Sequence, residues 1–132
     1  MASVTEYLDW IASQGWEWGD RDCLLWLATW AERVTGIDGG AEWRGRYRTA
    51  IGCARVMRKS GGFDACIERG AMAAGMVETD KPSPGSVGIV RAMTARGVSD
   101  VGGIYTGTRW AVLTGRGVVS GPFEYRRVWS FV

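Results

Sequence analysis

The residue with the clearest capacity for chemistry is Cys23, which follows Asp22 at the start of a segment with helical periodicity. A cysteine in the first turn of a helix lies near free backbone N–H groups and the positive end of the helix dipole, and both stabilise a thiolate. The neighbouring charges are divided, because Asp20 and Asp22 oppose a thiolate whereas Arg21 favours it. Position makes Cys23 a candidate nucleophile, and the alternative is a small buried residue on the core face of the helix.

The two other cysteines, Cys53 and Cys66, lack the surroundings of a reactive or metal-binding thiol. The chain has three cysteines and no histidine. Because one cysteine would be left over and no CxxC pair occurs, neither a disulfide framework nor a zinc site is indicated. We therefore expect synthesis in a reducing compartment, core positions for Cys53 and Cys66, no metal and no cofactor.

Helical patterns occupy the first half of the chain. A capping box that begins at Ser3 predicts a helix ending near Gly15. Asp22 is placed to cap a second helix, and Gly36 is placed to stop it. Two shorter helices are expected over 51–59 and 64–69, and the pattern over 70–75 is too weak to assign.

Beyond the loop at 81–85 the chain consists of short runs of β-branched and aromatic residues separated by glycine. Tight turns near 107–108 and 115–116 require antiparallel pairing. The chain is therefore expected to be a single α+β domain over 1–132, with N-terminal helices packed on a C-terminal antiparallel sheet of about five strands. The predicted strands are 86–91, 101–105, 110–114, 118–120 and 127–131.

Three short motifs follow one another along the chain: WGDRDC at 18–23, PGSVGIV at 84–90 and VGGIYTG at 101–107. Their order and spacing resemble those of the NlpC/P60 branch of the papain-like cysteine peptidases. In that family an Asp-Cys pair opens a helix, a strand with a Gly-Asp step follows, and the next strand supplies a histidine as the base. The resemblance covers roughly residues 16–114 and implies a papain-like fold.

Carried over residue by residue, the resemblance implies that Cys23 is the family nucleophile and that Val101 occupies the histidine position. A valine can neither activate a thiol nor protonate a leaving amine, so the site is expected to lack peptidase activity. Asp100 is adjacent to Val101, but successive strand residues face opposite sides of a sheet. Its carboxylate is therefore expected to point away from Cys23 and to be no substitute for the histidine.

Three further positions depart from the pattern of the family. Leu24 and Leu25 stand where the family has small residues, and Ser86 replaces the aspartate of the strand. Together with Val101, the two leucines are expected to place apolar bulk where the family keeps room for substrate. This change favours a scaffold role over catalysis.

The opening WEWGDRDC at 16–23 is also similar to that of small proteins encoded among phage-tail and gene-transfer-agent genes. This likeness implies a structural component of a bacteriophage-like tail tip or baseplate that docks to other tail proteins, such as hub or distal tail proteins. Its expected location is the virion, after synthesis in the cytoplasm of a bacterial host.

Two other readings stay open. One is a peptidoglycan-cleaving endopeptidase or amidase, with Cys23 as the nucleophile and an unorthodox or partner-supplied base. The other is a thiol-dependent regulator or acyl-binding protein, which depends on Cys23 alone.

Aromatic and arginine side chains are candidates for a binding surface. Of eight tryptophans, Trp16, Trp18, Trp43 and Trp110 lie in or beside glycine-rich loops or a turn, and we favour protein-interface anchoring over stacking on sugars. Arg46 lies in an Arg-rich aromatic stretch, but a net charge of +2 favours a protein partner over nucleic acid. No apolar run is long enough to cross a membrane and no signal peptide is recognised, so no membrane insertion is expected.

Overall fold

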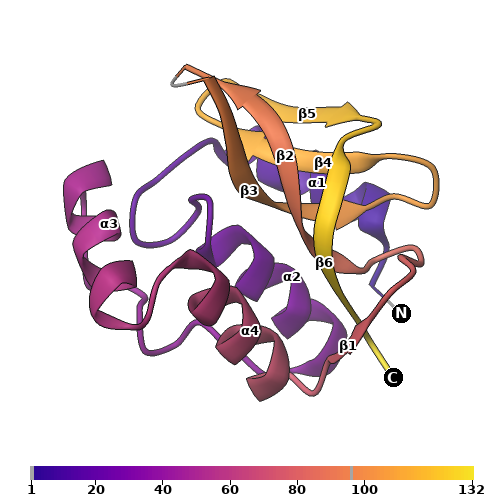
Figure 1. Cartoon of the computed structure of the whole chain (residues 1–132), viewed down its shortest axis with the longest axis horizontal. Helices are drawn as coiled ribbons and strands as arrows, with labels where there is room; N and C mark the ends of the chain where they lie inside the picture. The colour runs from indigo at the N-terminus through magenta and orange to yellow at the C-terminus, as the bar shows by residue number, and fades with distance from the viewer. Residues whose placement is uncertain (1, 96) are drawn as a thin grey trace.

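The computed structural model describes residues 2–95 and 97–132. Within them, four helices precede an antiparallel sheet, which confirms the predicted α+β class and the order of its parts (Figure 1). The helices are α1 (Val4–Gln14), α2 (Leu25–Thr35), α3 (Ala50–Lys59) and α4 (Phe63–Ala73). The strands are β1 (Val77–Thr79), β2 (Val87–Thr94), β3 (Gly97–Tyr105), β4 (Trp110–Thr114), β5 (Gly117–Gly121) and β6 (Glu124–Ser130).

The capping residues explain where the first two helices begin and end. The Ser3 hydroxyl accepts the Glu6 N–H at 3.3 Å, as the predicted capping box requires. At the end of α2, Gly36 adopts the left-handed conformation with φ 82°, so this glycine stops the helix as expected. Helix α4 continues four residues beyond its predicted end because Ala71 is also buried against the core.

The sheet has the order β1-β6-β2-β3-β4-β5, with every neighbouring pair antiparallel. It contains one strand more than expected. Strand β1 has only three residues, two of them exposed, and therefore lacks the alternation by which a strand is recognised. Strands β2 and β3 are also longer than predicted, since their hairpin continues to Thr94 and Gly97.

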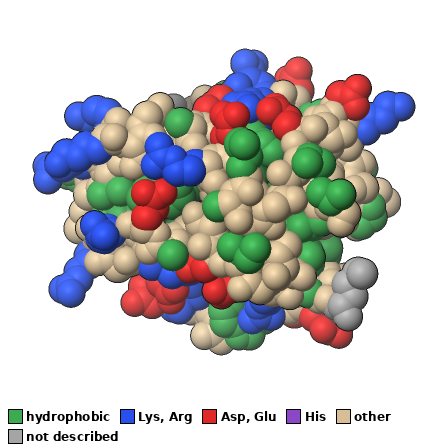
Figure 2. Space-filling model, turned by 90° about the horizontal axis from the view of Figure 1, so that it is seen from below, with side chains coloured by type: hydrophobic (Ala, Val, Ile, Leu, Met, Phe, Trp, Pro, Cys, Tyr) green, Lys and Arg blue, Asp and Glu red, His purple; other side chains and the backbone are tan. Residues whose placement is uncertain are grey.

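The main core lies between the helices and one face of the sheet. In Figure 1, α2 and α4 run side by side below the sheet, and α1 lies behind it, where it contacts β5. Seen from below, this side of the molecule carries acidic, basic and apolar side chains interspersed, with no single sign of charge prevailing (Figure 2). The largest fully buried core side chains are Tyr7, Ile11, Leu25, Trp26, Trp30, Ile89, Ile104 and Trp129.

A second, smaller cluster lies on the other face of the sheet and is built around Trp110. A Cβ added at Gly88 would lie 2.5 Å from one ring carbon of Trp110, and a Cβ added at Gly103 would lie 3.2 Å from another carbon of the same ring. The two glycines therefore allow the indole to lie directly against the backbones of β2 and β3. Tyr105 and Tyr125 flank the indole, with ring centroids at 5.1 and 5.8 Å.

Two hairpins separate at one end of the sheet. Strands β3 and β4 pair only from Gly103↔Val112 to Tyr105↔Trp110. In contrast, the β2–β3 ladder continues to Thr94↔Gly97, and the β4–β5 ladder continues to Thr114↔Gly117. The tips of the two hairpins therefore diverge, and the space between them is the main concavity near Cys23.

No helix among the described residues combines the length and apolar character needed to cross a membrane.

Candidate functional site

Asp22 fixes the backbone on which Cys23 lies. The Asp22 side chain is fully buried, and its Oδ1 atom accepts the N–H groups of Leu24 and Leu25 at 3.0 Å each. Its Oδ2 atom accepts the N–H of Gly19 at 2.8 Å, which ties the preceding loop to the helix. Asp22 therefore caps α2 as predicted, but Cys23 lies in the turn before the helix and not within its first turn.

The surroundings of the Cys23 thiol oppose its ionisation. A hydrogen bond with the Cys53 thiol, burial and the nearby Asp22 carboxylate together raise the pKa of Cys23 far above the ordinary range of a thiol. The thiol is therefore protonated at neutral pH. The lower pKa that was expected for a cysteine at a helix N-terminus is not observed. Cys23 itself is partly exposed.

Tyr47 and Cys53 complete the polar cluster behind Cys23. Cys53 is 1% exposed and comes from α3, so its predicted core position is confirmed, but its contact with Cys23 was not foreseen. The Tyr47 hydroxyl is buried and has no hydrogen bond of regular geometry among the described residues. Burial and the neighbouring Asp22 charge raise the pKa of Tyr47, so this phenol is neutral. Cys66 is fully buried and belongs to the core, as expected.

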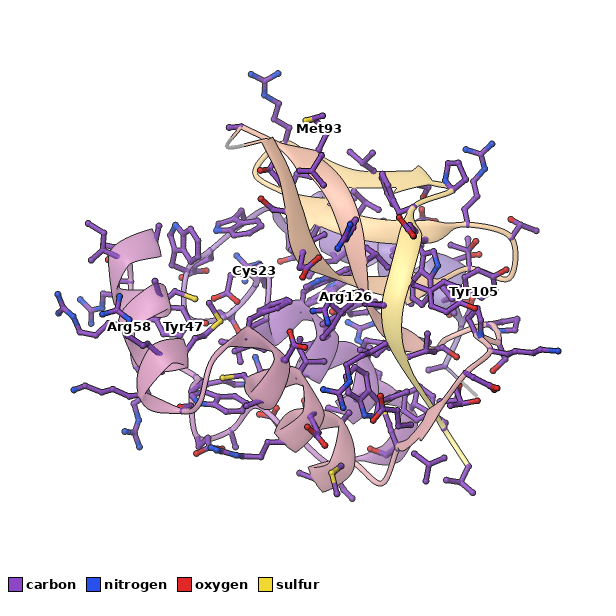
Figure 3. The ribbon with its side chains drawn as sticks, viewed as in Figure 1. Cys23, Tyr47, Arg58, Met93, Tyr105 and Arg126 are labelled. Atoms are coloured by element: carbon purple, nitrogen blue, oxygen red, sulfur yellow. The ribbon has the colours of Figure 1, made fainter. Side chains whose placement is uncertain are left out.

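A groove of about 670 Å³ lies between the diverging hairpins and the turn that carries Cys23. Both Cys23 and Val101 line it, but Val101 packs with Val90 and Trp110 on the face of β3 opposite to the one that Cys23 approaches. Figure 3 shows Cys23 between α3 and the β2–β3 hairpin, with Met93 near the tip of that hairpin. The other lining residues are Trp16, Ala92, Met93, Thr94, Ala95, Gly102, Val112, Leu113, Thr114, Gly115 and Arg116.

The groove holds no general base among the described residues. Apart from Cys23, Arg116 is the one ionisable side chain that lines it, and a guanidinium does not accept a proton at neutral pH. Asp100 does not line the groove. The predicted reason is wrong, however, because Asp100 lies on the same face of β3 as Gly102, which faces Leu27 and Cys23. It is Val101 that lies on the opposite face, where it packs with Val90 and Trp110. The Asp100 carboxylate accepts the Arg126 Nε–H at 3.1 Å and lies 3.8 Å from Arg91.

The expectation that leucines fill the cleft is wrong. Leu25 is fully buried in the main core, and Leu24 lines a separate pocket of about 30 Å³ between α2 and α4. Both side chains point into the core because they begin the apolar run at the N-terminus of α2, of which Leu24 is the N-cap and Leu25 the first residue. Ser86 is also remote from the groove, since its hydroxyl contacts Ser130 at 2.6 Å and accepts the Ser83 N–H at 2.9 Å.

The predicted binding residues divide between surface and core. Trp16 lines the groove, and Trp18 packs edge to face against it with ring centroids 5.0 Å apart. Arg46 is exposed. Trp43 and Trp110, however, are each only 2% exposed, so the prediction of surface anchors at these positions is wrong.

The loop that carries Trp43 folds back onto the helices, which explains its burial. Arg44 donates from Nε to Asp38 at 2.6 Å and from a terminal nitrogen to the Thr29 hydroxyl at 2.8 Å. This clamp holds the loop against α2, and the Trp43 indole donates to the Ser60 hydroxyl at 3.1 Å. Burial opposes ionisation of Asp38, but its hydrogen bonds to Arg44 and the Gly40 N–H outweigh burial and lower its pKa.

Sequence patterns contain no signal for Tyr47, Cys53 or Arg116 as neighbours of Cys23. Tyr47 and Cys53 come from a loop and the helix that follows it, Arg116 comes from the turn between β4 and β5, and all three are distant from Cys23 along the chain. Only the fold brings them to one place.

Comparison with known proteins gives the family of the chain. No curated protein and no solved structure matches it. One family model matches residues 1–131, nearly the whole chain. The chain therefore belongs to the family described as Domain of unknown function (DUF6950).

Proposed function

We propose that this protein is a structural component of a phage-like tail tip or baseplate, in which a catalytically inactive NlpC/P60-like domain docks onto other tail proteins. The likeness of its opening motif to small phage-tail and gene-transfer-agent proteins gives the setting. The observation that carries the inactive, docking role is the groove, where Cys23 lies with Val101 and without a general base among the described lining residues.

Cysteine hydrolases need a thiolate, a base that generates it and an acid that protonates the leaving group. In this groove the thiol is kept protonated by Cys53, by burial and by Asp22. Neither Val101 nor Arg116 can exchange a proton with a substrate at neutral pH. What remains is a concave surface with apolar walls, which suits binding better than bond cleavage.

A second candidate is a peptidoglycan-cleaving endopeptidase or amidase that receives its base from a partner. The observation in its favour is that Cys23 is partly exposed and opens onto the groove. The partner would also have to lower the pKa of a thiol that Cys53 and Asp22 hold in its neutral form. The docking role needs no such rearrangement.

Two measurements test the proposal. Purified peptidoglycan is incubated with the wild-type chain and with Cys23→Ala, and soluble fragments are quantified by mass spectrometry. Equal, background levels of fragments are expected. Immunogold labelling of phage-like particles with an antibody against this chain is expected to mark the end of the tail. Fragments released by the wild type alone, or particles without label, would contradict the proposal.

A further inference from the structure

One edge of β3 is left without a strand partner. Tyr105 donates its N–H to the Ser86 carbonyl at 2.9 Å, and its own carbonyl accepts the Gly85 N–H at 2.8 Å, so both groups face the side of β2. Alternate residues of a strand direct their N–H and C=O groups to the same side. The groups of Val98 and Asp100 therefore face away from β2, toward the side on which β4 has already diverged.

This free edge contains neither proline nor lysine over residues 97–102. Natural proteins cover an edge strand, interrupt it with proline or line it with lysine, because an open edge pairs with other chains. Here the cross-strand neighbours Met93 and Val98 are 76% and 65% exposed, so large apolar side chains stand beside the open backbone groups. The edge thus offers both hydrogen bonds and apolar contacts to an added strand.

The groove provides the space for such a strand. Its walls include Val101 and Gly102 of β3 on one side and Leu113 and Thr114 of β4 on the other. Side chains of an added strand would alternate between the two faces of the sheet. On one face they would meet Ala92 and Val101, and on the other they would meet Met93 and Val98.

The charges at the groove indicate the chemistry of the occupant. Arg116 stands on the wall opposite β3, and its guanidinium forms no salt bridge within the described residues. Asp100, the acidic residue of the β3 edge, is already paired with Arg126 at 3.0 Å. The unbalanced charge at the groove is therefore positive and complements a carboxylate.

We propose that the free edge of β3 binds an extended peptide segment of a partner protein by strand addition, with an acidic side chain of that segment paired to Arg116. Main-chain hydrogen bonds to Val98 and Asp100 hold the segment, and apolar side chains at alternate positions select it. This inference rests on the proposed docking function and names the part of the partner that the groove receives.

The test uses random linear peptides displayed on a carrier and selected against the full chain. Enriched peptides are expected to alternate apolar residues and to contain Asp or Glu. Their affinities are then measured for Val98→Pro, which removes the outward N–H, and for the matched control Val98→Thr, which keeps it. We expect Val98→Pro to weaken binding about tenfold or more and Val98→Thr to change it little. Arg116→Glu should weaken binding of the acidic peptides, and Arg116→Lys should preserve most of it.

Amide hydrogen exchange gives an independent readout. Exchange at Val98 and Asp100 should slow when an enriched peptide is bound, and thermal unfolding of each variant confirms that it is folded. The proposal is wrong if no peptide is enriched, or if enriched peptides bind Val98→Pro as tightly as the wild type. It is also wrong if the chain alone dimerises and Val98→Pro makes it monomeric, because the occupant is then a second copy.

The outcomes separate this inference from the proposed function. If tails are labelled but no peptide binds, the docking role is supported and the β3 edge is not the docking site. If peptides bind and peptidoglycan is cleaved in a Cys23-dependent way, the β3 edge is a binding site but the domain is catalytically active.

Discussion

The two ends of strand β3 differ although they belong to one continuous strand. Over 103–105 the strand is paired on both sides, and the Trp110 ring covers its Gly103 backbone. Over 97–101 it is paired with β2 alone and borders a groove of about 670 Å³. Strand propensity does not separate these ends, since both form a regular ladder with β2.

Packing accounts for the difference. At the closed end, one large side chain fills the space above Gly88 and Gly103 and draws β2, β3 and β4 together. At the open end, small residues such as Ala92 and Gly102 line the walls and leave the space unfilled. We therefore assign most of the stability to the closed end and the binding capacity to the open end, and four measurements examine this division.

The largest effect is expected for Trp110→Ala, which empties the cluster at the closed end. Removal of a buried indole should lower the free energy of unfolding by about 3–5 kcal/mol. The matched change at the open end is Met93→Ala, which should alter stability by about 0.5 kcal/mol or less because Met93 is exposed. Urea denaturation measures both values, and similar losses at the two sites would contradict the division.

A somewhat smaller loss is expected for Asp22→Ala at the base of the groove. The substitution leaves three N–H groups, those of Gly19, Leu24 and Leu25, without their acceptor. The free energy of unfolding should fall by about 2–3 kcal/mol. Ser3→Ala, at the exposed cap of α1, is the control and should cost about 1 kcal/mol. If the two substitutions lower the free energy of unfolding equally, the burial of Asp22 does not strengthen its capping interaction.

Gly88→Ala examines the close approach of Trp110 to β2. The added methyl group would meet the ring at 2.5 Å and the Arg127 carbonyl at 3.1 Å, so a loss of about 1–3 kcal/mol is expected. Gly115→Ala is the control in the hairpin turn, because a Cβ there has nothing within 4 Å. In the Trp110→Phe background the cost of Gly88→Ala should decrease, which a double-mutant cycle measures.

The smallest effect is kinetic and concerns the thiol at the open end. Because the pKa of Cys23 is raised, little thiolate is present at neutral pH, and alkylation by iodoacetamide should be slow and should accelerate as the pH rises. Cys53→Ala removes the largest cause of the shift and should speed the reaction at neutral pH. Cys66→Ala should not change it. Mass spectrometry of the labelled peptide gives the rates, and fast alkylation of the wild type would restore Cys23 as a nucleophile.

The α+β class, the helix caps and most strands were predictable from the sequence, because each depends on residues close together in the chain. Ser3, Asp22 and Gly36 act on backbone groups within a few positions of themselves, so their roles follow from spacing. The same holds for the turn at 115–116, which joins β4 and β5. Strand β1 was missed because its three residues depend on pairing with β6, far along the chain.

Local patterns in the chain are enough to predict the order of helices and strands, the capping of α2 beside Cys23 and the lack of a histidine to activate that thiol. The contact of Cys53 with Cys23, the burial of Trp43 and Trp110, and the open edge of β3 follow only from how the chain packs in three dimensions. The reason is physical: caps and turns arise from local hydrogen bonds, whereas burial, thiol contacts and an unpaired strand edge depend on which distant segments pack together.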